Sequence, residues 1–281
     1  MNAKFISWEE AVQWLKNQPD KQELVRSCYF DDPLENAADR YVKSEEWAAI
    51  KKILFKKLPG TVLDIGAGRG ITSYAFANTK SKVFALEPDP SEIVGASAIQ
   101  KLSKKNSSNI FVVRGIGEKL PFSKPTFDIV HGRQVLHHAK DLNNFCSEVY
   151  KVLKPGGFFI ATREHVISKR GDLDAFLASH PLHKMYGREY AYSLKEYTKM
   201  LRQSGFKIIR ILKPFESPIN YSPMLMAEFQ KHLSDRIEKV SGNMFASWIS
   251  SKDWFKTAVA KTYELFDNTP GRLFTFITIK T

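Results

Sequence analysis

The sequence predicts an α/β protein with a doubly wound, mostly parallel sheet, and two observations carry this prediction. From residue 59 onward, short apolar runs alternate with stretches of helical spacing, which is typical of βαβ units with helices on both faces of a sheet. The 281 residues are 43% hydrophobic and 26% charged, which fits one large domain or one domain with an insertion. This composition excludes disordered and collagen-like chains.

Residues 1–58 are expected to form an N-terminal helical segment or cap. Ser7 is a candidate N-cap with Glu10 as its capping-box partner. A second helix is expected after Ser44, because acidic residues fill its first turn and apolar residues recur on one face. The acidic stretch Asp31–Tyr41 contains a proline and is expected to be a loop.

Residues 59–214 are expected to form the core of the domain. The expected strands in this region are 61–65, 82–87, 109–115, 127–132, 156–164 and 206–212. The segments that follow these strands favour helices, including one over 141–153 and one that starts at Ser193 and ends at Gly205. Residues 269–281, which include RLFTFITIK, are expected to supply the last strand.

Two segments interrupt this alternation. Residues 166–192 form an insertion that is aromatic and basic, and it is expected to cover a ligand pocket or to be a surface excursion. Residues 215–268 contain two amphipathic patterns, which predict a helical insertion before the last strand. That second insertion would act as a lid, as a subunit contact or as an extra layer of packing.

The most specific motif is VLDIGAGRG at residues 62–70. An apolar strand there leads into a turn of three glycines and then into a helix, so the backbone can approach a ligand closely. The glycines follow a G-x-G-x-G pattern rather than the G-x-G-x-x-G of dinucleotide-binding proteins. Glu87, at the end of the next strand, can accept hydrogen bonds from both hydroxyls of a ribose.

This combination resembles motif I and the following acidic position of class I S-adenosylmethionine-dependent methyltransferases. The segments 114–122, 127–141 and 153–164 are similar to later motifs of the same family and come in the family's order. The resemblance extends from about residue 40 to about residue 212, and it is strongest for the small-molecule methyltransferase type. It implies a seven-stranded Rossmann-like sheet with an antiparallel last strand, and S-adenosyl-L-methionine as the cofactor.

The resemblance also assigns the cofactor contacts. They are Tyr41, Asp64, Gly66, Ala67, Gly68, Gly70, Glu87, Pro88, Ile116, Gly117, Glu118, His131 and Arg133. One departure from the family concerns the adenine, because Ile116 stands where the family usually has an aspartate and Gly117 where it has an alanine. Adenine recognition is therefore expected to depend on apolar contact from Ile116 and on backbone groups, rather than on a side-chain role for Glu118.

The candidate catalytic residues lie where the fourth and fifth strands end, since open α/β sheets bind ligands at the carboxyl ends of their strands. His138 and His165 are candidates for a base that takes a proton from a hydroxyl or ammonium acceptor. Arg163, Glu164 and Tyr186 are expected to contact the acceptor. No metal site is predicted, because His180 and His183 have no third ligand at a convincing spacing.

The net charge of +12 leaves other readings open. One alternative is an RNA or protein methyltransferase, which would use the excess of basic over acidic residues to bind its substrate. The basic residues are spread thinly along the chain, however, so nucleic acid is not the favoured partner. A module that binds the cofactor without catalysis is a further alternative. A cytoplasmic monomer or homodimer without a membrane anchor is expected, since no apolar run approaches 18 residues and the two cysteines suit a reducing compartment.

Overall fold

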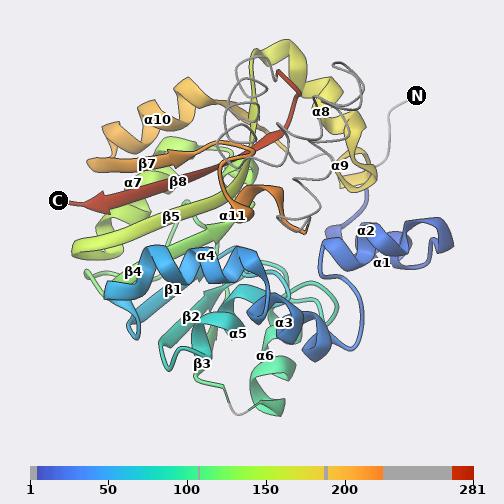
Figure 1. Ribbon diagram of the computed structural model, residues 1–281, viewed down its shortest axis with the longest axis horizontal. Coiled ribbons are helices and arrows are strands. Elements are labelled where there is room, and N and C mark those ends of the chain that lie inside the picture. The colour runs from blue at the N-terminus through green and yellow to red at the C-terminus, as the bar shows by residue number, and fades with distance from the viewer. Residues whose placement is uncertain (1–4, 107, 187–188, 224–267) are drawn as a thin grey trace, which may run out of the picture.

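The computed structural model describes residues 5–106, 108–186, 189–223 and 268–281 (Figure 1). Within these residues the chain forms one twisted sheet with helices on both faces, and the N-terminal helices lie beside it (Figure 1). The α/β class and the doubly wound arrangement predicted from the sequence are confirmed.

The main path of the sheet has seven strands in the order β3-β2-β1-β4-β5-β8-β7. The strands are β1 (Thr61–Ile65), β2 (Lys82–Leu86), β3 (Ile110–Val113), β4 (Phe127–Arg133), β5 (Leu153–Ile167), β7 (Phe206–Leu212) and β8 (Arg272–Lys280). The last strand, β8, pairs antiparallel with β5 and β7, and the other pairs are parallel. A two-residue strand, β6 (Tyr192–Ser193), pairs with the end of β5. The seven strands and the antiparallel last strand were both predicted.

The two faces of the sheet are covered by different helices. The helices of the core are α4 (Glu45–Leu54), α5 (Ile71–Ala77), α6 (Ala96–Lys105), α7 (Leu142–Val152) and α10 (Leu194–Gln203). On one face, Trp47 of α4 and Phe76 of α5 pack on strand residues such as Ile129. On the other face, Phe145 of α7 and Tyr197 of α10 pack against the opposite side of the same strands. Because β1 and β4 are buried on both sides, their carboxyl ends are held rigidly.

The N-terminal segment contains α1 (Trp8–Lys16), α2 (Gln22–Ser27) and α3 (Leu34–Val42). The capping box predicted at Ser7 is present, with the Ser7 N–H donating to Glu10 Oε2 at 2.8 Å and the Glu10 N–H donating to Ser7 Oγ at 3.2 Å. The predicted loop over Asp31–Tyr41 was wrong, since most of it is α3. Pro33 stands at the N-cap of that helix, where its missing N–H leaves no helical bond unmade.

The insertion at 166–192 forms two short helices, α8 (Leu173–Ser179) and α9 (Pro181–Tyr186). Helix α9 packs on α1, where Leu182 joins Leu15 in a small apolar cluster. The two helices predicted within 215–268 lie outside the described residues, since their apolar patterns cover 226–240 and 255–266. The described part of that segment contains a short helix that was not predicted, α11 (Pro218–Tyr221). Among the described residues, every helix is too short or too polar to cross a lipid bilayer.

Candidate active site

The glycine turn joins the carboxyl end of β1 to α5. Gly66, Gly68 and Gly70 all have positive φ values, of 63°, 54° and 85°, which glycine adopts at little cost. A Cβ at Gly66 would lie 2.5 Å from Val135 Cγ2, so that glycine is required by packing. A Cβ at Gly68 would meet no heavy atom nearer than 3.9 Å. The turn is therefore closed against the protein at Gly66 and open to a ligand at Gly68.

Glu87 lies directly against this turn. Its carboxylate accepts hydrogen bonds from the backbone N–H of Gly68 at 2.7 Å and of Asp89 at 2.9 Å. Burial raises the pKa of the Glu87 carboxyl to about 7. A carboxylate oxygen can accept more than one hydrogen bond, so both oxygens keep capacity for ribose hydroxyls. The open glycine and the adjacent carboxylate fit S-adenosylmethionine.

Asp64 and His131 lie deeper in the sheet than the turn. Asp64 Oδ2 accepts hydrogen bonds from the hydroxyls of Thr72 at 2.7 Å and Ser73 at 2.6 Å. His131 Nδ1 donates to Asp64 Oδ1 at 3.0 Å, and its Nε2 lies 3.3 Å from the hydroxyl of Thr162. Both Asp64 and His131 are buried. These contacts hold the turn between β1 and α5 in place, and the expected contact of Asp64 and His131 with the cofactor stays a prediction.

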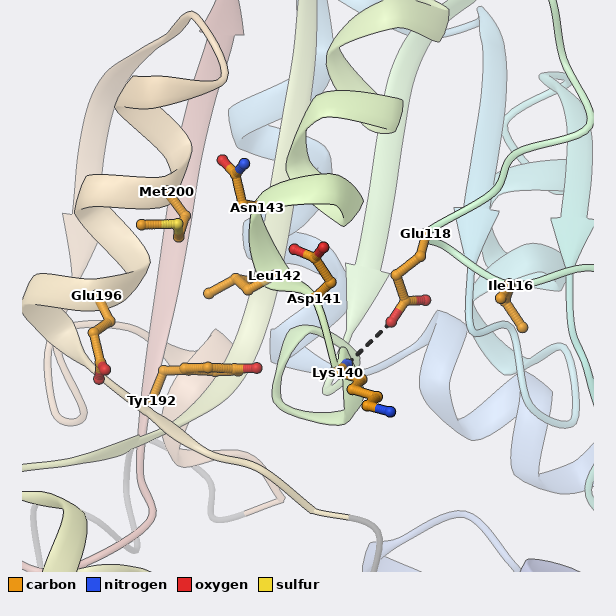
Figure 2. Close-up of a pocket in the computed structure, with 9 residues that line it drawn as sticks. All are labelled: Ile116, Glu118, Lys140, Asp141, Leu142, Asn143, Tyr192, Glu196 and Met200. Carbon is orange, nitrogen blue, oxygen red and sulfur yellow. Dashed lines mark hydrogen bonds between the residues drawn. The ribbon is translucent and has the colours of Figure 1, made fainter.

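The loop after β3 carries the residues expected at the adenine. Ile116 is 51% exposed, as an apolar wall for a ligand requires. A Cβ at Gly117 would lie 1.9 Å from a ring atom of Phe145, which accounts for glycine at that position. Glu118 Oε1 accepts a hydrogen bond from the Lys140 N–H at 3.0 Å, so its side chain ties this loop to the one before α7 (Figure 2). Pro88, another expected cofactor contact, is exposed.

A hollow of about 650 Å³ lies beyond this loop, between the start of α7 and α10 (Figure 2). Its walls include Ile116, Leu142, Tyr192 and Met200. The hollow shares Ile116 and Glu118 with the expected cofactor contacts, but its walls contain no glycine of the turn and no histidine. The acceptor is therefore expected outside this hollow, at the carboxyl ends of β4 and β5.

Arg133, at the end of β4, forms a buried ion pair that sequence reasoning missed. Its Nε and Nη2 donate to the two oxygens of Glu46 at 2.7 and 3.1 Å, and its guanidinium lies over the rings of Tyr29 and Tyr41. Burial raises the pKa of Glu46, but the charges of Arg133 and Arg163 outweigh it and leave that pKa below its usual value. Tyr41, an expected cofactor contact, is fully buried beneath this pair.

Arg69, within the glycine turn, connects the turn to the N-terminal segment. Its Nη1 donates to the carbonyl oxygens of Tyr29 at 3.0 Å and Asp31 at 3.1 Å, and its Nη2 donates to Asp32 at 2.5 Å. The side chain is 5% exposed. This role of Arg69 could not be predicted from the sequence, because its hydrogen-bond partners lie about 40 residues earlier in the chain.

The end of β5 carries three of the expected site residues. Arg163 has a φ of 59° at a bulge in β5, and its Nη1 donates to the carbonyls of Ile219 and Asn220. Burial lowers the pKa of Arg163. These hydrogen bonds join β5 to α11, so Arg163 holds the two elements together. Its expected contact with the acceptor stays a prediction.

Glu164 holds the turn that follows β4. Its carboxylate accepts hydrogen bonds from the backbone N–H groups of Val135 and Leu136, each at 3.0 Å, and from His137 Nδ1 at 2.9 Å. Burial raises the pKa of Glu164 to about 7. Glu164 was predicted to contact the acceptor. In the structure its oxygens instead accept hydrogen bonds from the turn that carries His137 and His138.

His165 lies beside this turn. Its Nδ1 lies 2.8 Å from the carbonyl oxygen of Gly271, and since a carbonyl can only accept, Nδ1 carries the proton. The lone pair of Nε2 then faces the side-chain amide of Gln134 at 3.3 Å. Burial lowers the pKa of His165 well below its usual value. The imidazole is therefore neutral.

These groups belong to one assembly, buried except at the partly exposed His138 and His165, which we call the histidine cluster. It contains His137, His138, His165, His183, Glu164 and Glu189. Tyr186, the remaining expected acceptor contact, lies with its ring 6.4 Å from that of His138. The two predicted bases, His138 and His165, are thus brought together with three acidic or imidazole groups that the sequence did not predict as a site.

Comparison with known proteins places this geometry in a family. The family model "Methyltransferase domain" matches residues 63–161. YcgJ of Bacillus subtilis, an uncharacterized methyltransferase, is 33% identical over 116 residues, which cover 41% of this chain and 45% of that protein. Its crystal structure is similar with a TM-score of 0.53 and 21% identity, over 84% of this chain and 97% of that one.

The uncharacterized methyltransferase sll0829 of Synechocystis sp. is 31% identical over 156 residues, which cover 53% of this chain and 68% of that protein. This chain belongs to the class I S-adenosylmethionine-dependent methyltransferases. A demethylmenaquinone methyltransferase of Lactococcus lactis is 26% identical over 225 residues, which cover 77% of this chain and 86% of that protein.

Family membership makes the chain a methyltransferase with S-adenosylmethionine as its cofactor. The cofactor predicted from the glycine pattern and Glu87 is thereby confirmed. The residues that hold it stay a prediction, which the open turn at Gly68 and the carboxylate of Glu87 support. The match to YcgJ spans less than half of that relative's length.

Proposed function

We propose that this methyltransferase acts on a small-molecule acceptor at an oxygen or nitrogen atom, and that a hydroxyl group is the preferred acceptor. The observation that supports this proposal is the histidine cluster at the carboxyl ends of β4 and β5. A hydroxyl must lose its proton as it is methylated, and neutral imidazoles beside buried carboxylates can receive a proton.

The cofactor, when bound, supplies a methyl group on a positively charged sulfur, which is an excellent electrophile. The chain's own task is to align the acceptor with that methyl group, to exclude water and to remove one proton. Gly68 and Glu87 would hold the adenosine side at the ends of β1 and β2. The histidine cluster would face the acceptor at the ends of β4 and β5.

His165 is the better candidate for the base within the cluster. The hydrogen bond from Nδ1 to Gly271 fixes its tautomer, so that Nε2 has a lone pair to receive the proton. His138 is 36% exposed at its side chain, but its Nδ1 lies 3.3 Å from Glu189 Oε2, to which it is turned. The acceptor's proton would pass to Nε2 of His165, and Gln134 would turn from that nitrogen toward the acceptor.

A carbon atom next to a hydroxyl is the second candidate for the methylated position. It is favoured by a relative in Pneumocystis carinii that is named sterol 24-C-methyltransferase, a name that places the methyl group on carbon, and that is 27% identical over 63% of this chain. The same base would serve, since loss of the hydroxyl proton makes the neighbouring carbon of a phenol or enol nucleophilic. The two candidates differ in the product and not in the residues.

The test is a measurement of S-adenosylhomocysteine release with a panel of phenols, enols, alcohols and amines, with total RNA and a basic protein as further arms. Turnover with hydroxylated small molecules, absent in the Glu87→Ala variant, would support the proposal. The position of the new methyl group in the product separates oxygen, nitrogen and carbon. Turnover with RNA or protein alone would contradict it.

A further inference from the structure

Three side chains of the histidine cluster converge on one point that the proposed chemistry leaves unused. His137 and His138 come from the turn after β4, and Glu189 comes from the segment after α9. The Glu189 Oε2 atom lies 3.3 Å from His137 Nε2 and 3.3 Å from His138 Nδ1. One donor atom from each of the three residues lies within 4.8 Å of the others.

The Glu189 carboxylate is not satisfied by the protein around it. Its side chain is fully buried, and neither of its oxygens accepts a hydrogen bond from any residue that the structure describes. A buried carboxylate without hydrogen bonds is costly and rare in native proteins. A cation among these groups would supply the missing partner.

His183, on α9, offers a fourth donor on the other side of the carboxylate. Its Nε2 lies 3.9 Å from Glu189 Oε1. Its ring is mostly buried, and within the described part of the chain its Nδ1 has no hydrogen-bond partner. Either ring nitrogen of His183 is therefore available to a ligand without breaking a hydrogen bond that the structure records.

The orientation of His137 is the one that metal-bound histidines have. Its Nδ1–H donates to Glu164 Oε2 at 2.9 Å, which leaves the lone pair of Nε2 directed at Glu189. Glu164 is itself fixed by backbone N–H groups. A carboxylate behind the histidine is the usual second layer of a zinc or iron site, where it fixes the tautomer and strengthens the ligand.

We propose that His137, His138 and Glu189 bind one divalent transition-metal ion, with His183 as a fourth donor. Ligands about 2.0–2.1 Å from Zn²⁺ in a tetrahedral site lie about 3.3–3.4 Å from one another. The two separations of 3.3 Å at Glu189 Oε2 match this value. Imidazoles with one carboxylate suit Zn²⁺, and two histidines with one carboxylate also suit Fe²⁺, whereas Mg²⁺ and Ca²⁺ prefer oxygen ligands.

The proposal that this site binds a metal ion does not depend on the proposed function, but a catalytic role for the ion does. An acceptor hydroxyl could become a further ligand of the ion, and the positive charge would lower its pKa. In that arrangement His138 is a ligand, and His165 is the group that receives the proton. The O–H bond breaks as the N–H bond at Nε2 forms, and the oxygen gains the methyl group as the carbon–sulfur bond of the cofactor breaks.

The experiment measures metal binding to the full chain, produced without an affinity tag that binds metals. After treatment with a chelator, the protein is titrated with Zn²⁺, Fe²⁺, Mn²⁺ and Co²⁺ in turn. We expect one ion per chain, a rise in melting temperature with the preferred ion, and intense visible absorption with Co²⁺ in a site of low coordination number. The variants described next distinguish an ion bound at the proposed site from an ion bound elsewhere on the chain.

Glu189→Gln and His138→Gln should each weaken binding of the preferred ion by about 100-fold or more, a larger effect than the 10–100-fold of a second-layer change. His180→Asn is the matched control, because His180 Nδ1 accepts from the Leu182 N–H and an asparagine can replace that contact. The control should bind the ion normally. Each variant must still bind S-adenosylhomocysteine, which shows that it is folded.

Failure to bind any of the four ions, or equal binding by the Glu189→Gln variant and the parent chain, would overturn the metal site. A bound ion without methylation of any hydroxylated acceptor would leave the site in place and contradict the proposed function. Methylation that is unchanged after complete removal of the ion would contradict its catalytic role.

Discussion

The proposed cofactor half of the site and the proposed acceptor half differ in how completely their carboxylates are hydrogen-bonded. In the cofactor half, formed by the ends of β1 and β2, Asp64 and Glu87 accept two or three hydrogen bonds each from nearby hydroxyl, imidazole and backbone groups. In the acceptor half, formed by the ends of β4 and β5 with α9, Glu189 accepts none from the described residues. The carboxylates of the first half therefore have protein partners before any ligand binds, whereas the Glu189 carboxylate in the second half has none among the described residues.

The largest effect should come from a change in the acceptor half. His165→Ala should lower turnover by roughly 10²–10⁴-fold, because the base is lost, while cofactor affinity stays nearly unchanged. His165→Gln is the sharper variant, since an amide can still donate to the Gly271 carbonyl but cannot take a proton. Steady-state kinetics with an identified acceptor provide the measurement. Normal turnover of the His165→Gln variant would show that His165 is not the base and serves only in packing.

The two glycines of the turn form a matched pair in the cofactor half. Gly66→Ala should lower the free energy of unfolding by about 2–4 kcal/mol, because a left-handed backbone costs an alanine about 1–2 kcal/mol and crowding against Val135 adds to it. Gly68→Ala should cost only about 1–2 kcal/mol, since its Cβ would meet open space. Denaturant unfolding measures both. The second variant should instead lose affinity for S-adenosylhomocysteine, and if it binds normally, the ligand does not approach Gly68.

Glu87 tests whether the cofactor half binds a ribose. Glu87→Ala should weaken binding of S-adenosylhomocysteine by roughly 1.5–3 kcal/mol, the size of hydrogen bonds to a charged group. Isothermal titration calorimetry gives the affinity. An unchanged affinity would show that the ribose is held by other residues, and tight binding of NAD in place of S-adenosylhomocysteine would contradict the cofactor assignment.

The pH dependence of binding is the smallest effect. Burial raises the pKa of Glu87 to about 7, so the carboxyl is neutral below that pH in the free protein and ionised above it. Only the ionised form accepts hydrogen bonds from both hydroxyls, so affinity for S-adenosylhomocysteine should rise from pH 6 to pH 8, by up to about tenfold per pH unit below 7. Glu87→Gln should flatten this rise.

The ligand-free protein should respond to pH in the opposite sense. The pKa of Glu87 is higher in the folded chain than in the unfolded one, so its contribution to stability is present at low pH and is lost as the pH rises through about 7. Comparison of unfolding at pH 5 and pH 8 for the parent chain and for Glu87→Gln measures this contribution. Equal pH dependence in both would place the titration on another group.

The same contrast explains what could be predicted from the sequence. The glycine turn and Glu87 lie within 22 residues of one another, and their roles follow from local spacing, so the cofactor was predicted. Glu189 and Gln134 gave no such signal, because their partners are brought together only by the order of the strands. His180 and His183 were considered as a metal pair and no site was predicted from them, because no third ligand had a convincing spacing; of the two, only His183 lies in the histidine cluster.

The fold could be predicted from the sequence except where one residue type is typical of two different structures. The strands and the antiparallel β8 followed from apolar runs and from the family resemblance. Helix α3 was missed because Pro33 and the acids beside it are equally typical of a loop and of the first turn of a helix. The acids of that stretch have specific partners, since Asp31 binds Arg40 and Asp32 binds Arg69.

Arg69 has a consequence for the order in which ligands enter and leave. It fastens the loop before α3 to the glycine turn of the cofactor half, while α1 is fastened to α9 of the acceptor half by the hydrogen bond from Ile6 to Met185 and by the rings of Trp8 and Tyr186. The N-terminal segment thus bridges both halves. A displacement of that segment as one piece would break both sets of contacts. If the cofactor and the acceptor bind in the two proposed halves, their exchange would then be coupled, and product-inhibition kinetics should show an ordered sequence.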